Sequence, residues 1–289
     1  MRALSLVVFV FSLLLLGTPA SAEDLVVFSW NIKDLTADNI STKDRLAAIC
    51  SAISESGADV SFLLETLRGA DDIGKEVVDT LNKSYDQANK YEYRWSRVGQ
   101  EGTRIEYGLA IIRTLSKGKI IHIMDYGFFD RSYSGAKDFV KVSVAHGTSH
   151  ANSDSKSGNN SQTLQTKGPL FYGGRVPLYL TVAVEKDRKN VLETTIASWH
   201  APGPSNNPAE IWQTVKAGLI KAEIPMVIGD FNFEGMRDVV RPHGTTKGLK
   251  HYDDAILLND KYSIKEITSA PDRSTKATDH QWIRAVLRK

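Results

Sequence analysis

The sequence contains only one cysteine, Cys50, in 289 residues. No internal disulfide can form, so the folded chain must be stabilised by packing of its core. Cys50 lies in the segment RLAAICSAI, where Leu46, Ile49 and Ile53 fall on the same face of a predicted helix. We therefore interpret Cys50 as a small buried apolar residue and give it no catalytic role.

Long apolar runs are also absent beyond the N-terminus. The run from Leu4 to Leu16 is too short to span a membrane comfortably, and no second run follows it. Arg2 precedes this run and the small residues Ala20-Ser21-Ala22 follow it, a pattern typical of a secretory signal peptide. We expect residues 1–22 to be removed near Ala22, leaving a secreted or periplasmic protein without a stable membrane anchor. A retained anchor is the alternative.

A strong charge of one sign is missing as well. The net charge of +2 falls to +1 once Arg2 is removed, which neither requires nor excludes a polyanionic partner. Hydrophobic residues make up 42% of the chain and charged residues 24%, as in ordinary soluble globular proteins. Because no repeat and no linker separates two cores, we expect residues 23–289 to form a single domain and a monomer.

Strand-like and helix-like segments alternate along the chain. Predicted strands cover residues 25–30, 60–64, 107–113, 176–184, 194–199 and 226–231. Predicted helices cover residues 43–56, the segment with Ile73, Val77, Val78 and Leu81, and the segment with Ile211, Val215 and Leu219. Strands outnumber helices and several adjoin in sequence, which indicates an α/β protein with two packed sheets.

One segment lacks this periodicity. Residues 146–174 are rich in Ser, Asn, Gly and Thr. We expect a long surface loop between strands, which is either a flexible excursion or a flap that faces the substrate.

Polar residues stand repeatedly where a predicted strand ends or begins. They are Asn31 in SWNI, Glu65 in FLLE, His200 in ASWH, Asp230 and Asn232 in IGDFN, and Asp279 and His280 in TDHQWI. Strand ends gather on one rim of a layered sheet, so these side chains are expected to lie together. Carboxylates are costly to bury without a partner, and such a cluster predicts a bound cation or a hydrogen-bond network.

These residue types suit the hydrolysis of a phosphodiester. Oxygen ligands such as Glu65 and Asp279 favour a hard cation, Mg²⁺ or Ca²⁺, over zinc. Histidines transfer protons near neutral pH, Asp230 could orient or deprotonate water, and the amide of Asn232 could position phosphate or water. Singly, Asn232 could cap a turn and His200 could be an ordinary hydrogen-bonded side chain. Their combination at several strand ends favours a functional site.

The ordered motifs SWNI, LLET, YGLAII, SWHAP, GDFN and TDH resemble the endonuclease/exonuclease/phosphatase superfamily, and within it the secreted pancreatic-type deoxyribonucleases. The resemblance spans nearly all of the mature chain. It implies a four-layer α/β sandwich, in which two mixed β-sheets pack face to face with helices outside. It also implies a divalent-metal phosphodiesterase site at one edge of the sandwich.

The resemblance also implies roles for individual residues. Asn31, Glu65 and Asp279 match the metal site, for which we expect Mg²⁺, with Mn²⁺ or Ca²⁺ as alternatives. Glu106 in RIEYGLAII resembles the glutamate that pairs with the first catalytic histidine, here His200. One or two metal ions are both compatible with the motifs.

Two further assignments rest on shorter motifs. In YDDAIL the resemblance favours Asp254 as the carboxylate that orients His280, and Asp253 is the alternative by a shift of one residue. In GGRVPLYL it implies that Arg175 reaches a substrate phosphate. The chain departs from the family pattern in having Thr278 where serine is usual, no disulfides, and a long loop before Arg175.

The expected mechanism therefore uses two histidine–carboxylate pairs around one phosphate, with catalytic roles for His200, His280, Glu106, Asp254, Asp230 and Asn232. No Ser, Cys or Tyr is placed as a covalent nucleophile, so water attacks directly. Which histidine is the acid and which the base is left open.

Basic residues placed near the same rim favour a polyanionic substrate, although each alone could be a solvated surface charge. They are Lys33, Arg68, Arg104 and Arg175. We expect an endonuclease that hydrolyses DNA without sequence preference, with RNA left open. The alternatives are a secreted sphingomyelinase or phosphoinositide phosphatase, for which YGFF (126–129) is a candidate membrane-facing hairpin, and a catalytically inactive binding scaffold.

Overall fold

The computed structural model describes residues 24–101, 104–116, 118–131, 139–143, 175–203, 208–232, 253–269, 278 and 280–289. The predicted signal peptide (1–22), the predicted loop (146–174) and Asp279 lie outside the described residues. What was predicted for them therefore stays a prediction.

The first half of the sandwich is a six-stranded mixed sheet with the order β11-β12-β1-β2-β4-β3. Its strands are β1 (Asp24–Leu35), β2 (Val60–Thr66), β3 (Lys90–Glu101), β4 (Arg104–Ser116), β11 (Ser263–Ser269) and β12 (Ile283–Arg288). Only β1 and β2 are parallel among these neighbours. That parallel pair brings Asn31 next to the end of β2, where Glu65 follows Leu64.

The second half has the order β6-β5-β7-β8-β9-β10. Its strands are β5 (Lys119–Arg131), β6 (Phe139–Ser143), β7 (Leu178–Lys186), β8 (Lys189–His200), β9 (Met226–Asp230) and β10 (Asp253–Leu257). Among the described strand pairs, the two halves are joined at the β4–β5 turn, where Leu115 pairs with Ile120 and Ser116 with Lys119. The hydrogen-bonded path is therefore continuous, while the two halves pack against each other.

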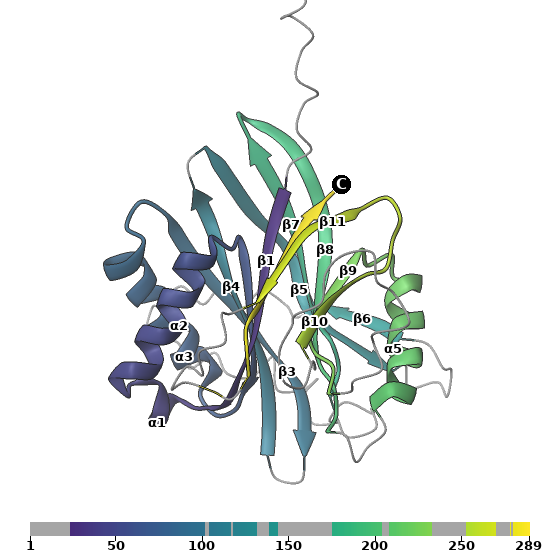
Figure 1. Ribbon diagram of the computed structural model, residues 1–289, viewed down its shortest axis with the longest axis horizontal. Coiled ribbons are helices and arrows are strands. Elements are labelled where there is room, and N and C mark those ends of the chain that lie inside the picture. The colour runs from purple at the N-terminus through teal and green to yellow at the C-terminus, as the bar shows by residue number, and fades with distance from the viewer. Residues whose placement is uncertain are drawn as a thin grey trace, which may run out of the picture.

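Alternation along the strands separates two cores. On β1, Leu25 and Val27 belong to the core between the two halves, whereas Phe28 and Trp30 face the core beneath the helices. Helices α1 (Ala37–Ile40), α2 (Lys43–Ser56) and α3 (Ala70–Thr80), with the π-helical turn η1 (Leu81–Tyr85), cover the first half. Helix α5 (Pro208–Lys221) covers the second half. Figure 1 shows these layers, which confirm the predicted four-layer α/β sandwich.

Local chemistry explains where the helices begin, end and pack. Helix α2 ends at Gly57, which adopts a left-handed conformation (φ 63°) that glycine accepts without strain. Helix α5 packs through Trp212, whose ring stacks on Trp199 of β8 at a centroid distance of 5.8 Å. Cys50 lies on the inner face of α2 and is fully buried, as predicted.

The candidate membrane hairpin YGFF lies inside β5. Its residues Tyr126 and Phe129 are 6% and 0% exposed, so they belong to the core. No helix within the described ranges is long and apolar enough to cross a membrane.

Candidate active site

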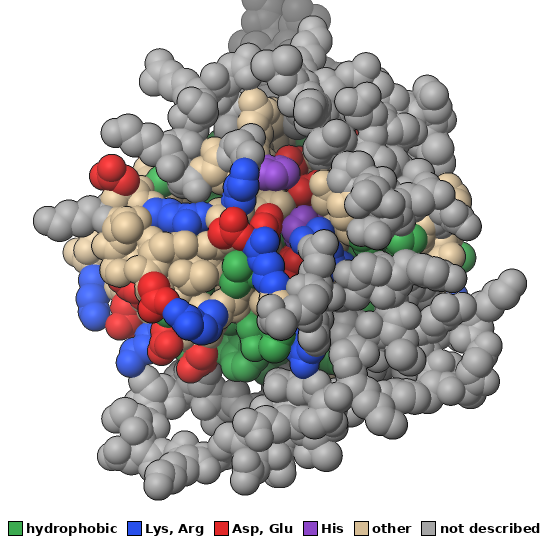
Figure 2. All heavy atoms as spheres, turned by 90° about the horizontal axis from the view of Figure 1, so that it is seen from below, with side chains coloured by type: hydrophobic (Ala, Val, Ile, Leu, Met, Phe, Trp, Pro, Cys, Tyr) green, Lys and Arg blue, Asp and Glu red, His purple; other side chains and the backbone are tan. Residues whose placement is uncertain are grey.

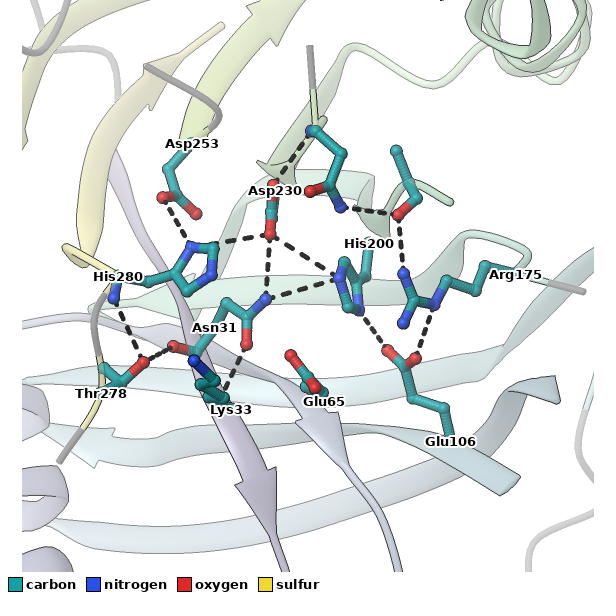
Figure 3. Close-up of polar contacts among 12 residues, drawn as sticks. Asn31, Lys33, Glu65, Glu106, Arg175, His200, Asp230, Asp253, Thr278 and His280 are labelled. Atoms are coloured by element: carbon teal, nitrogen blue, oxygen red, sulfur yellow. Dashed lines mark hydrogen bonds and ion pairs between the residues drawn. The ribbon is translucent and has the colours of Figure 1, made fainter. Parts of the chain in front are cut away.

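Within the described residues, the polar side chains predicted at strand ends meet at one edge of the sandwich. In the parallel pair β8–β9, His200 lies opposite Asp230, and in the antiparallel pair β9–β10, Asp253 lies opposite the same Asp230. Asn31 comes from β1 and His280 from the segment before β12. Figure 3 shows these side chains converging from different strands.

Asp230 is the centre of the arrangement and is fully buried. Its Oδ2 accepts a hydrogen bond from Asn31 Nδ2 at 2.9 Å and lies 3.6 Å from both His200 Nε2 and His280 Nδ1. Its Oδ1 accepts a hydrogen bond from the backbone N–H of Asn232 at 3.0 Å. One carboxylate oxygen is therefore shared between two imidazoles.

Sterics explain why the GDFN motif begins with a glycine, Gly229. A Cβ at Gly229 would collide with the carbonyl oxygen of Trp199 on the neighbouring strand. Glycine at this position lets β9 approach β8 closely. That approach places Asp230 beside His200.

His200 is backed by Glu106, as the family motif implied. Its Nδ1 lies 2.5 Å from Glu106 Oε1, and both residues are almost completely buried. Burial by itself would raise the pKa of Glu106, but the charges of His200 and Arg175 outweigh it and hold the pKa below the usual value. For His200, burial would lower the pKa, but Glu106 outweighs it and the pKa is raised. The pair therefore favours an ionised carboxylate and a charged imidazole.

Arg175 points into this pair. Its Nε donates to Glu106 Oε2 at 2.8 Å, and its Nη1 donates to the carbonyl oxygen of Ala201 at 3.0 Å. The guanidinium that was predicted to reach a substrate phosphate thus contacts the carboxylate behind His200.

His280 is held by backbone contacts on both sides. Its N–H donates to Thr278 Oγ1 at 3.2 Å, and its carbonyl oxygen accepts a hydrogen bond from Trp30 Nε1 at 3.1 Å. The Thr278 hydroxyl in turn donates to the carbonyl oxygen of Asn31 at 3.0 Å. Threonine therefore supplies the hydroxyl expected from the serine that is usual at this position.

The carboxylate beside His280 belongs to Asp253. Its Oδ2 lies 3.4 Å from His280 Nδ1, whereas Asp254 Oδ1 accepts a hydrogen bond from the N–H of Ala255. This contact favours Asp253, the alternative named in the sequence analysis, over Asp254 as the partner of His280. Asp253 is opposite Asp230 across the β9–β10 pair, whereas Asp254 is opposite Gly229, so the strand register decides between them.

The neighbouring carboxylates of Asp230 and Asp253 repel each other. Burial and the negative charge of Asp230 raise the pKa of Asp253 to about 7, against the opposing effect of His280. A proton or a bound cation relieves this repulsion. Ligand atoms of Asp230, Asp253 and His280 lie within 4.8 Å of one another and could hold a metal ion.

The predicted metal ligands Asn31 and Glu65 lie beside each other on β1 and β2. Glu65 Oε1 accepts a hydrogen bond from Arg104 Nη2 at 2.9 Å, and the same guanidinium also pairs with Asp34. Arg104, predicted near the substrate, thus places a cation against the Glu65 carboxylate. Amide and carboxylate oxygens of this kind suit Mg²⁺ or Ca²⁺.

The strand that carries Asn31 does not end there, contrary to the prediction. It continues to Leu35 through an irregular stretch in which Lys33 and Asp34 have positive φ angles of 45° and 55°. Asn31 Oδ1 accepts a hydrogen bond from Lys33 N at 2.9 Å, and the guanidinium of Arg45 binds the carbonyl oxygens of Ile32 and Lys33. These contacts hold the backbone in a conformation that non-glycine residues seldom adopt.

Two predicted basic residues are exposed. Lys33 is exposed, and Arg68 pairs with Asp38, both side chains being largely exposed. Figure 2 shows basic and acidic side chains mixed around the histidines on this face of the molecule.

Sequence reasoning did not find two contributors. The backbone of Ala201 accepts hydrogen bonds from both Arg175 Nη1 and Asn232 Nδ2, at 3.0 and 2.8 Å. Arg45 reaches the strand irregularity from α2. A backbone carbonyl has no signature in sequence, and Arg45 stands in an ordinary amphipathic helix.

Solved structures of endonuclease/exonuclease/phosphatase proteins have this fold. The Bacteroides vulgatus protein superposes with a TM-score of 0.56 at 14% identity, covering 92% of this chain and 99% of that one. The Bacteroides thetaiotaomicron protein gives 0.53 at 13% identity, covering 92% and 98%. A humanized D. rerio TDP2 with 14 mutations gives 0.51 at 12% identity, covering 92% and 99%.

No family model and no curated protein matches the sequence. The structural likeness shows that the chain has the endonuclease/exonuclease/phosphatase fold, as the motifs predicted. A fold hosts many functions, so activity must be inferred from the site.

Proposed function

We propose that this protein is an exported, divalent-metal-dependent phosphodiesterase that cleaves DNA by direct attack of water. The observation that carries the proposal is the position of Asp230 Oδ2, 3.6 Å from each of two imidazoles. Each imidazole has its own carboxylate behind it, Glu106 for His200 and Asp253 for His280. Two proton-transfer groups and one water-orienting carboxylate suit the hydrolysis of a phosphodiester.

The histidines share the acid and base roles in this proposal. Glu106 fixes Nδ1 of His200, so Nε2 faces Asp230 and the reacting phosphate. Nδ1 of His280 faces Asp253 and Asp230, so the opposite edge of its ring meets the phosphate. Asp230 orients the attacking water, and Asn232 stabilises the turn after β9 through its bond to Ala201.

The metal site that fits the residues is formed by Asn31 and Glu65, with Asp279 as a further expected ligand. The chemistry of the donor set supports this, because both described ligands offer oxygen atoms and Glu65 already attracts the Arg104 guanidinium. A bound Mg²⁺ ion would polarise the phosphoryl oxygen and offset charge on the leaving oxygen.

DNA is the substrate we favour over a lipid. Lys33, two residues after Asn31, and Arg68, three residues after Glu65, are exposed cations of the kind that binds a phosphate backbone. In the candidate membrane hairpin, by contrast, Tyr126 and Phe129 are buried in β5 and belong to the core.

The substrate is tested with the purified mature protein in Mg²⁺. Supercoiled plasmid, single-stranded RNA, and vesicles containing sphingomyelin or phosphoinositide are compared at two salt concentrations. We expect the plasmid to be nicked without sequence preference, and the apparent affinity for it to fall steeply as the salt concentration rises. Arg68→Ala should reduce that salt dependence and leave turnover at saturating plasmid unchanged. Release of lipid headgroup with intact plasmid would contradict the DNA assignment, and no turnover of any substrate would support the inactive scaffold.

A further inference from the structure

The guanidinium of Arg175 is enclosed by the site itself. Its side chain is 12% exposed, and it donates to a carboxylate oxygen of Glu106 and to the carbonyl oxygen of Ala201. The other oxygen of Glu106 contacts His200. One carboxylate is thus held between an imidazole and a guanidinium.

The backbone around Arg175 is fixed in place at two points. Val176 N donates to the carbonyl oxygen of Val98 on β3 at 2.7 Å, and Trp199 Nε1 donates to the carbonyl oxygen of Arg175 at 3.4 Å. These bonds attach the start of β7 to both halves of the sandwich. Arg175 therefore reaches Glu106 from a rigid base.

The second partner of Arg175 connects it to the GDFN turn. The carbonyl oxygen of Ala201 also accepts a hydrogen bond from Asn232 Nδ2 at 2.8 Å, and Ala201 N donates to the carbonyl oxygen of Asp230 at 2.7 Å. A chain of hydrogen bonds thus runs from Glu106 through Arg175 and Ala201 to Asn232. Figure 3 shows Glu106 and Arg175, the start of this chain, beside His200.

We propose that Arg175 is a positioning residue, which holds Glu106 behind His200 and the Ala201 carbonyl beside the GDFN turn, and that it is not a ligand of the substrate phosphate. The proposal rests on the phosphodiesterase function proposed above. Glu106 is buried, and a buried carboxylate needs a permanent positive charge when the imidazole is neutral. Arginine donates to the carboxylate and to the carbonyl from two different nitrogens of one planar group, Nε and Nη1, whereas lysine would have to make both bonds from a single nitrogen.

The matched control is Arg113 at the other end of the sandwich. Its Nη2 contacts the buried carboxylate of Asp59 at 3.0 Å and the carbonyl oxygen of Gly57 at 2.7 Å, and its side chain is 14% exposed. Arg175 and Arg113 thus have the same kinds of partners and nearly the same exposure. Arg113→Ala should lower thermal stability as Arg175→Ala does, without changing turnover.

The kinetic test compares Arg175→Ala, Arg175→Lys, Glu106→Gln and the Arg175→Ala/Glu106→Gln double variant on plasmid. We expect Arg175→Ala to lower kcat at least about tenfold, with KM and the salt dependence of binding unchanged, and Arg175→Lys to recover part of the loss. The double variant should be within about twofold of the worse single variant, because both act through the same carboxylate. A raised KM with unchanged kcat and a weaker salt dependence, or additive losses, would identify a phosphate ligand and overturn the proposal.

A readout without substrate separates this inference from the proposed function. The short His200–Glu106 contact should give a low-field proton NMR signal that is absent in His200→Ala and in Glu106→Gln. We expect Arg175→Ala to lose or broaden this signal, Arg113→Ala to retain it, and Arg175→Lys to be intermediate. An unchanged signal in folded Arg175→Ala would refute the positioning role even if the wild-type protein cleaved no phosphodiester.

Discussion

Asp230 and Asp253 lie directly opposite each other at the edge of the antiparallel β9–β10 pair. The relationship places Asp253 within 3.4 Å of His280, while the next residue, Asp254, belongs to the other face of the strand. We predict that Asp253→Asn lowers turnover nearly as much as loss of the His280 imidazole, and that Asp254→Asn has a much smaller effect. Steady-state kinetics on plasmid measures both. Equal losses in the two variants would contradict the assignment.

The same pair of carboxylates predicts a dependence of stability on pH. Because the pKa of Asp253 is raised from its ordinary value of 3.8 to about 7, the folded state binds this proton more tightly than the unfolded state. The stabilisation is complete below pH 3.8 and is lost as the pH rises through 7. In excess chelator, Asp253→Asn should therefore be more stable than wild type at pH 8, by on the order of 2 kcal/mol. This advantage of the variant should be smaller at pH 5, where Asp253 of the folded wild-type protein is protonated. Urea unfolding at both pH values measures this, with Asp254→Asn as the control. If the difference in unfolding free energy between wild type and Asp253→Asn were the same at both pH values, repulsion between the carboxylates would not be its cause.

The two imidazoles should contribute to the reaction more than to binding. We predict that His200→Ala and His280→Ala each lower kcat by at least about a hundredfold, with smaller effects on KM. Rapid-quench or gel assays of plasmid cleavage measure the change. Near-normal turnover in either variant would remove that histidine from the proposed mechanism.

Cys50 should be inert in the folded protein. It is fully buried, and burial raises the pKa of its thiol to about 12, so almost no thiolate forms near neutral pH. We predict no labelling by a thiol reagent under native conditions and complete labelling in denaturant. Rapid native labelling, or loss of activity on labelling, would show that the thiol is accessible.

The sequence predicted those elements whose apolar pattern is simple. The helix over 43–56 and the strands near 25–30 and 60–64 have clear periodicity, and α2, β1 and β2 lie there. The long strands β3 and β5 were missed. In β3, Tyr91 and Tyr93 alternate with charged residues such as Glu92, a strand pattern that was not recognised, whereas the exposed Met124 of β5 interrupts its pattern. Packing against neighbouring strands compensates for the interrupted pattern of β5.

The sequence predicted which residues form the site better than it predicted which of them contact each other. Strand ends indicated which residues would meet, and the structure brings together Asn31, His200, Asp230 and His280. The choice between Asp253 and Asp254 depends on strand register, and the direction of Arg175 depends on where Ala201 and Glu106 lie in three dimensions. Neither is encoded in a short motif.

The central claim is that a divalent metal and the two-histidine site together hydrolyse a phosphodiester. The most direct measurement is nicking of supercoiled plasmid by the purified protein, first in excess EDTA and then after Mg²⁺ or Mn²⁺ is added back. The His200→Ala/His280→Ala double variant, purified in the same way, is the control for contaminating nuclease. We predict no nicking in EDTA, full activity after Mg²⁺ or Mn²⁺ is restored, and none by the double variant in either condition. Undiminished nicking in EDTA, or equal nicking by the double variant, would contradict the account.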